Sequence, residues 1–205
     1  MSKTGIGSHT KPNRGESVNW ITPPEVVDAL GLFDLDPCCP RFMPWRTANV
    51  MLSRDRRGNE NPEAATTLTA CGLQHKWSGR VWLNPPYDKS LPQWFSKLAR
   101  HGNGCALVFA RTETEWFFKW VWPWATALRF IAGRLTFRLP DGAAPAHNSG
   151  GPSVLVAYGP ACAEQLRTCA IPGAFVDLNA ARYASHFPIT QPRGRSLTNA
   201  DSQAG

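Results

Sequence analysis

The chain has 205 residues, of which 42% are hydrophobic, enough for one domain with a buried core and too few for two domains of ordinary size. Its formal net charge of +7 excludes an acidic protein and is typical of chains that approach a phosphate backbone. No apolar run reaches about eighteen residues, and the N-terminal residues lack the apolar segment of a secretory signal. We therefore expect a cytoplasmic protein without membrane contact.

The two ends of the chain differ in composition from the middle. Residues 1–17 and 188–205 are rich in Gly, Ser, Pro, Asn and basic residues, a composition typical of flexible tails. We therefore expect one domain over residues 18–187, and a monomer. Six cysteines without an export signal indicate reduced thiols. Because neither CxxC nor HxxxH spacing occurs, we expect no metal site.

The first expected helix begins at Thr22. This residue is placed to act as the N-cap, with Pro23 at the first helical position and Glu25 completing a capping box. A short buried strand is expected next, over residues 32–36. Residues 41–78 are polar and irregular, so we expect neither helix nor strand there.

Strands and helices are expected to alternate over the rest of the domain. The expected strands cover 80–84, 105–110, 128–131, 134–138 and 153–158, and the expected helices cover 92–100, 113–122 and 162–169. This alternation predicts an α/β fold with a mostly parallel sheet flanked by helices. In such sheets ligands bind at the carboxyl ends of strands. Asp36 and Asn84 both stand at expected strand ends, so we expect them at the same edge.

The segment Asn84-Pro85-Pro86-Tyr87 carries a specific chemistry. A double proline cannot continue a sheet ladder, so the chain must leave the sheet here. The side-chain oxygen of Asn84 and the carbonyl of Pro85 can each accept one N–H bond from a nucleobase amino group, which directs the nitrogen lone pair toward an incoming methyl group. Tyr87 would stack against a base swung out of the duplex. The structural alternative is a rigid turn with Tyr87 packed at the edge of the core.

Four segments, in order, resemble the phage-type DNA N6-adenine methyltransferases, which are related to the Dam methylases. They are Trp20-Ile21-Thr22-Pro23-Pro24-Glu25, Phe33-Asp34-Leu35-Asp36-Pro37-Cys38, residues 77–87 with Asn84-Pro85-Pro86-Tyr87 at their end, and Gly133-Arg134-Leu135-Thr136-Phe137. The resemblance covers residues 20–158. It implies a Rossmann-like fold that binds S-adenosylmethionine, DNA as the substrate, and Asn84-Pro85-Pro86-Tyr87 as the catalytic centre.

The resemblance also implies the two sides of the site. The cofactor would contact Thr22, Pro23, Asp36, Pro37, Cys38 and Asn84. The DNA would contact Tyr87, Arg111, Thr112 and Arg134. Besides Tyr87, three of these residues have structural alternatives. Asp36 would serve as a helix or turn cap, Thr112 as a helix N-cap, and Arg134 as part of a solvated basic face.

Two departures from the family pattern keep other functions open. The turn after Asp36 contains no glycine, whereas methyltransferases at large have a glycine-rich turn there. Cys71 stands where relatives carry an acid before the Gly72-Leu73 pair. Three functions are therefore considered: transfer of methyl to adenine N6, transfer to the amino group of cytosine, which the same acceptors would serve, and DNA binding by a module of this fold that has lost catalysis.

Overall fold

The fold comes from a computed structural model, which describes residues 21–40, 43–53, 67–69, 71–139, 141–144 and 151–178. The expected tails, 1–17 and 188–205, lie outside these ranges. The described elements are α1 (Pro24–Asp28), β1 (Leu35–Asp36), β2 (Val50–Ser53), β3 (Thr67–Thr69), β4 (Val81–Leu83), α2 (Leu91–His101), β5 (Gly104–Phe109), α3 (Glu115–Trp120), β6 (Ala127–Ile131), β7 (Ser153–Tyr158), α4 (Pro160–Thr168) and β8 (Gly173–Asp177).

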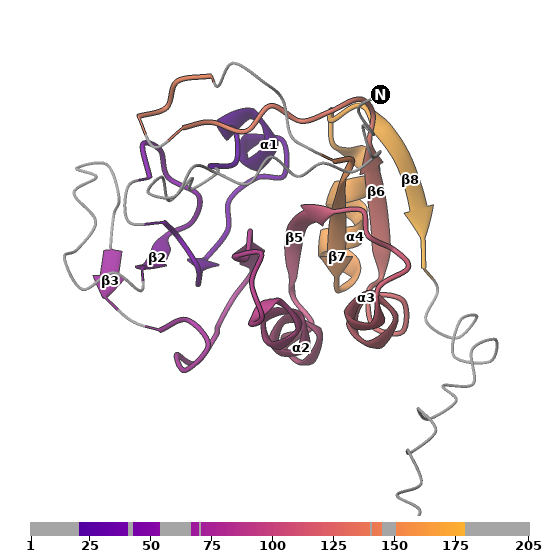
Figure 1. The fold of residues 1–205 in the computed structure, drawn as a ribbon, viewed down its shortest axis with the longest axis horizontal. Helices are drawn as coiled ribbons and strands as arrows, with labels where there is room; N and C mark the ends of the chain where they lie inside the picture. The colour runs from indigo at the N-terminus through magenta and orange to yellow at the C-terminus, as the bar shows by residue number, and fades with distance from the viewer. Residues whose placement is uncertain are drawn as a thin grey trace, which may run out of the picture.

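The strands form one eight-stranded sheet in the order β3-β2-β1-β4-β5-β7-β6-β8 (Figure 1). The four pairings from β3 to β5 are parallel. The remaining three, which join β5, β7, β6 and β8, are antiparallel. The α/β class expected from the sequence is confirmed. The sheet is mixed, so the expected parallel arrangement holds only for the half from β3 to β5.

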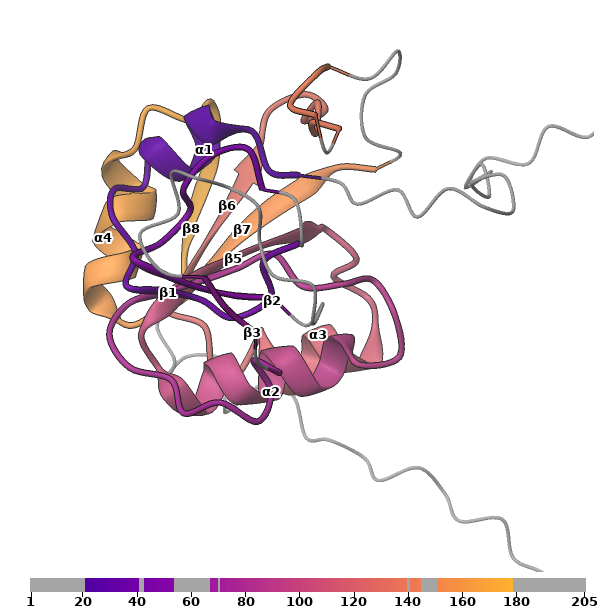
Figure 2. The same cartoon turned by 90° about the vertical axis from the view of Figure 1, so that its left-hand side faces the viewer.

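Helices cover both faces of the sheet (Figure 2). Successive strand residues point to opposite faces, and the two buried clusters follow this alternation. Val81 and Leu83 of β4 belong to a cluster with Phe95 of α2. Trp82, between them, belongs to a second cluster with Cys162 of α4. The result is a layer of α2 and α3, the sheet, and a layer of α1 and α4.

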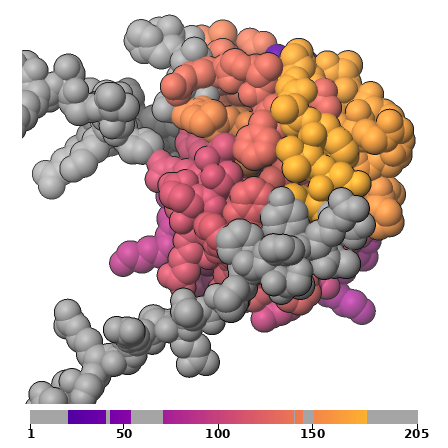
Figure 3. Space-filling model, turned by 90° about the vertical axis from the view of Figure 1, so that its right-hand side faces the viewer, coloured from indigo at the N-terminus to yellow at the C-terminus, as the bar shows by residue number. Residues whose placement is uncertain are grey.

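Helix α2 leads the chain away from the end of β4. Five of its residues are buried at helical spacing, including Trp94, Phe95 and Leu98. The helix ends at Gly102, whose φ of 71° is left-handed and suits glycine. At the far margin of the sheet β8 lies on the molecular surface, drawn in yellow in Figure 3. None of the described helices is long and apolar enough to cross a membrane.

Three segments differ from the expected elements. Strands β2 and β3 form within the stretch expected to be irregular, and β8 follows the strand that was expected to be last. The strand expected over 134–138 is wrong, because that segment makes only an isolated bridge from Arg138 to Ile21. Strands of three or four residues are too short to show a periodicity, so their pairing depends on the tertiary fold.

Candidate active site

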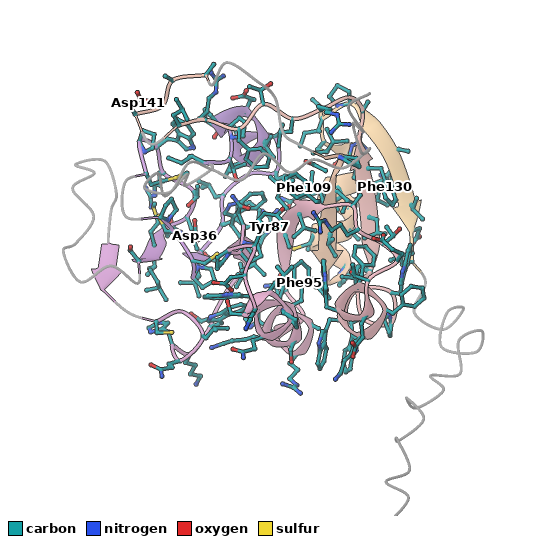
Figure 4. The ribbon with its side chains drawn as sticks, in the orientation of Figure 1. Asp36, Tyr87, Phe95, Phe109, Phe130 and Asp141 are labelled. Atoms are coloured by element: carbon teal, nitrogen blue, oxygen red, sulfur yellow. The ribbon has the colours of Figure 1, made fainter. Side chains whose placement is uncertain are left out.

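Asp36 and Asn84 flank the point at which the sheet changes its direction of growth. From β1 the sheet extends through β2 and β3 to one side and through β4 and β5 to the other. Ligands of doubly wound sheets bind outside the carboxyl ends of the two strands at such a switch point. Asp36 ends β1 and Asn84 follows β4 directly. Figure 4 shows Tyr87 between Asp36 and Phe109, at the carboxyl edge.

The side chain of Asn84 is anchored by a distant segment. Its Nδ2 donates to Thr22 Oγ1 at 3.0 Å, and its backbone carbonyl accepts a hydrogen bond from Cys38 Sγ at 3.2 Å. Thr22 is buried, and its own carbonyl accepts from Trp45 Nε1 at 3.1 Å. The expected N-cap role of Thr22 is wrong, because α1 begins at Pro24 with Pro23 as its N-cap residue. The hydroxyl of Thr22 is instead used to hold Asn84.

Two acceptors at this corner receive no hydrogen bond from the described part of the chain. They are Asn84 Oδ1 and the carbonyl of Pro85. Both prolines have a restricted φ, so the acceptors sit on a stiff segment. Pro85 is buried while Pro86 is exposed, which places the corner at the surface of the molecule. A donor that enters here meets two acceptors fixed at the end of β4.

Tyr87 is anchored on the end of the neighbouring strand. Its ring centroid lies 4.8 Å from that of Phe109, and its hydroxyl accepts a hydrogen bond from the Phe109 N–H at 2.9 Å. Because β4 has ended at Leu83, this N–H lies beyond the parallel ladder and the tyrosine oxygen takes the place of a strand carbonyl. Burial raises the pKa of the Tyr87 hydroxyl, so the phenol stays neutral. The residue is nevertheless 48% exposed, which leaves ring surface for a stacking ligand.

Asp36 is buried and caps its own turn. Its Oδ1 accepts from the Cys38 N–H at 3.1 Å, and its Oδ2 accepts from Thr47 Oγ1 at 2.5 Å. The bond to Cys38 spans two residues and is the turn-cap arrangement expected as the structural alternative. Burial raises the pKa of Asp36 to about 6, and the bonds from Thr47 and Cys38 offset only part of this effect. The carboxylate retains further acceptor capacity, since each oxygen has two lone-pair sites.

The thiol of Cys38 connects the two sides of the switch point. Burial, with the negative charge of Asp36 as a second cause, raises the pKa of Cys38 well above its usual value. The side chain is therefore a neutral thiol and donates to the carbonyl of Asn84. A thiolate nucleophile is disfavoured here, and Cys38 acts as a link between the turn after β1 and the loop after β4. All six cysteines are free thiols.

A close backbone contact next to this turn is made by Gly72. A Cβ at this position would lie 1.8 Å from the carbonyl oxygen of Pro37, so only glycine fits. The carbonyl of Gly72 accepts from Trp77 Nε1 at 2.8 Å and from Lys97 Nζ at 3.1 Å. The turn after Asp36 contains no glycine. The close backbone contact with this turn is made by Gly72 in the neighbouring segment instead.

Lys97 of α2 holds the segment that contains Gly72. Its Nζ also donates to the carbonyls of Leu73 and His75, at 2.7 and 2.6 Å. The ammonium lies 5.0 Å from the Trp77 ring centroid. Partial burial lowers the pKa of Lys97. Three carbonyl acceptors on one cation fix this segment against α2.

The residues expected on the DNA side are placed at different distances from Asn84. Arg111 is exposed just past β5 and acts electrostatically on the Tyr87 hydroxyl. Thr112 is half-buried, and its carbonyl accepts from Trp122 Nε1 at 3.2 Å. The helix cap considered at Thr112 is wrong, because the N-cap residue of α3 is Thr114.

Arg134 lies at the same edge of the sheet but further along it. It is exposed and follows β6, which runs parallel to β5 because both are antiparallel to β7. Three strand spacings separate β6 from β4, about 14 Å at the usual interstrand distance. Arg134 therefore follows a strand that is separated from β4 by β5 and β7.

Sequence reasoning missed Thr47, Lys97 and Phe109. Phe109 ends β5, so the strand-end rule that selected Asp36 would also have selected it. Thr47 and Lys97 have no such signal, since their partners lie in distant turns and only the fold brings them together.

Comparison with known proteins assigns no family to this chain. Searches of protein-family models, of curated proteins and of solved structures found no match to the chain. Within the described residues, no group of three or more His, Cys, Asp or Glu side chains could hold a metal ion.

Proposed function

We propose that this chain is a DNA methyltransferase that transfers a methyl group from S-adenosylmethionine to the N6 amino group of adenine. One observation carries the proposal: Asn84 Oδ1 and the Pro85 carbonyl are open acceptors beside the half-exposed ring of Tyr87. An exocyclic amino group needs such acceptors, and a base needs such a ring. The resemblance of four segments to phage-type adenine methyltransferases supports the same activity, and a Rossmann-like fold of that class agrees with the α/β sheet.

The residues around the switch point fit the cofactor. S-adenosylmethionine would supply the methyl group from a sulfonium, whose sulfur keeps the electron pair of the broken bond. Asp36 offers a carboxylate at the end of β1, and its raised pKa reflects burial that a cationic ligand would offset. Pro37 and Cys38 continue the same turn, and Thr22 and Pro23 adjoin it through the contact with Asn84. These residues would hold the cofactor next to the acceptor pair.

The chain's own groups would activate the base by position and polarity. Asn84 Oδ1 and the Pro85 carbonyl accept the two N–H bonds and draw the nitrogen toward a tetrahedral geometry, which frees its lone pair for the methyl carbon. The proton lost from this nitrogen passes to water. Thr22 and Cys38 keep Asn84 fixed, so little reorganisation is needed during transfer.

Tyr87 would hold the base outside the duplex. Unstacking a base costs a few kcal/mol, and stacking on an aromatic ring returns about 1–3 kcal/mol. The hydroxyl bond and the ring contact to Phe109 fix the tyrosine before the base arrives. The ring therefore loses little side-chain entropy on binding.

Labelled S-adenosylmethionine incubated with unmethylated DNA tests the proposal directly. Nucleoside analysis should recover label in N6-methyladenine, and Asn84→Ala should reduce transfer at least about 100-fold, as loss of a preorganised polar group typically does. Asn103→Ala is the matched control, because this amide precedes β5 at the opposite edge and donates to Gly79. Label in N4-methylcytosine would assign the same acceptors to cytosine. DNA binding without any incorporation would leave only a binding module.

A further inference from the structure

A groove on the outer surface of the helical layer lies outside the site. It is lined by residues of α2 and α3, which pack side by side on one face of the sheet (Figure 1). Its volume is about 650 Å³, and it is lined by Leu73, Pro92, Gln93, Ser96, Lys97, Arg100, Lys119 and Trp120. Three of these eight residues are basic and none is acidic. Neither Asn84 nor Tyr87 lines it.

The groove extends away from the site along α2. Pro92 and Gln93 stand in the first turn of this helix, which begins four residues after Tyr87, while Arg100 stands in its last turn. Eleven residues of helix span about 16 Å, about the length of two or three nucleotides of an extended strand. Lys119 and Trp120 complete the far end from α3. A nucleic-acid strand that leaves the site at the start of α2 can therefore follow this groove.

The far end combines cationic groups with an aromatic ring. The Arg100 guanidinium carbon lies 5.3 Å from the Trp120 ring centroid, and Lys119 Nζ lies 5.5 Å from it. A guanidinium held over a ring keeps its N–H donors in its own plane, where a phosphate can accept them in pairs. The Trp120 ring lies 6.4 Å from that of Trp124, which is 50% exposed. Cations next to aromatic rings are the features with which proteins follow a nucleic-acid strand.

We propose that this groove binds the DNA backbone that flanks the target base, with Arg100 and Lys119 as its phosphate contacts. This inference rests on the proposed function, because DNA bound at the proposed site would reach the groove at the start of α2. The groove itself is a binding surface and takes no part in methyl transfer. Its occupant is assigned by charge: a cationic groove with no acidic lining residue, in a chain of net charge +7, complements phosphate.

Charge reversal at two matched positions tests the groove. Arg100→Glu reverses a charge in the last turn of α2, and Arg167→Glu makes the same change in the last turn of α4, on the opposite face of the sheet. Each variant lowers the net charge by two and places an acid at the same point of a helix dipole. Binding of an unmethylated 20-base-pair duplex is measured by fluorescence anisotropy between 50 and 200 mM salt, about the range over which phosphate contacts are most visible.

We expect Arg100→Glu to weaken binding about tenfold and to reduce the slope of log affinity against log salt by about 1, the loss of one phosphate contact. Arg167→Glu should stay within about twofold of the parent. Equal losses in both variants would mean that only net charge matters, and parental binding by Arg100→Glu would leave the groove without a DNA role. Either result overturns the proposal. If the parent methylates no DNA but Arg100→Glu alone loses binding, the proposed function fails and the groove stands.

Discussion

The side-chain amide of Asn84 donates to the hydroxyl of Thr22 at 3.0 Å, although 62 positions separate the two residues in the chain. In this arrangement the nitrogen of the amide faces Thr22. With the nitrogen bound to Thr22, the oxygen remains as an acceptor at the end of β4. Thr22 therefore has a positioning role in the proposed reaction, alongside any contact it makes with the cofactor.

Thr22→Val should impair transfer through the orientation of Asn84. The valine keeps the shape of the side chain but leaves Asn84 Nδ2 without its acceptor, at a cost of about 1–3 kcal/mol. We expect kcat to fall about 10- to 100-fold, a larger change than in the Kd for S-adenosylmethionine, to which Thr22 is only one of several expected contacts. Steady-state kinetics and calorimetry measure the two quantities.

Two controls separate positioning from stability. Thr22→Ser keeps the hydroxyl and should recover most of the rate. Thr126→Val removes a hydroxyl that accepts from the Gly159 N–H, remote from the proposed site, and should lower Tm without lowering kcat. Thr22→Val with parental kcat would contradict the positioning role.

Two substitutions should separate the contribution of the Tyr87 hydroxyl from that of the Tyr87 ring. Tyr87→Phe keeps the ring but removes the acceptor for the Phe109 N–H, so Tm should fall slightly while kcat/KM stays within about threefold. Tyr87→Ala removes the ring, and kcat/KM should fall about 5- to 150-fold, the equivalent of 1–3 kcal/mol of stacking. The alternative role of Tyr87 as a purely structural residue predicts instead that activity follows Tm in both variants.

The sequence predicted the residues at the carboxyl edge of the sheet better than it predicted the strands of the sheet. Strand β4 and its double proline are local features, so the residue pattern alone was enough to place Asn84 and Tyr87 at a strand end. The same holds for Asp36. Strands β2 and β3 lack a pattern of their own and exist because β1 offers a partner to β2, which in turn pairs with β3. The roles of Thr22 and Lys97 could not be predicted either, since each depends on a contact that only the closed fold creates.

Gly72→Ala should lower the stability of the fold and also abolish the binding of S-adenosylmethionine. The added Cβ would meet the carbonyl of Pro37 at 1.8 Å, and relief requires one of the two turns to move. Overpacking of this kind costs about 1–3 kcal/mol or more. Differential scanning fluorimetry with and without S-adenosylmethionine should show a lower Tm and no ligand-induced rise.

Gly151→Ala provides the matched control for this change. A Cβ there would meet the ring of Phe109 at 3.5 Å, an ordinary contact distance, so Tm and the ligand-induced rise should remain near parental values. If Gly72→Ala still shows the full ligand-induced rise, the contact between the two turns does not shape the cofactor site.

Asp36→Asn should make the protein more stable and less able to bind its cofactor. Raising a carboxyl pKa from 3.8 to about 6 costs the ionised form about 3 kcal/mol of folding free energy at neutral pH. The neutral amide avoids most of this cost, so we expect Tm at pH 7 to rise by several degrees. The lost charge should weaken S-adenosylmethionine binding about 10- to 100-fold, as for a hydrogen bond to a charged group.

The pH dependence of this gain identifies its cause. Between about pH 4 and 6 folded Asp36 keeps a proton that the unfolded chain has released, so the parent becomes more stable as pH falls through this range. The stability advantage of Asp36→Asn should therefore be complete above pH 6 and vanish near pH 4. Asp141→Asn is the control, because that exposed carboxylate accepts a bond across two residues, from the Ala143 N–H, in the same way. An advantage of Asp36→Asn that persists at pH 4 would show that burial of the charge is not its source.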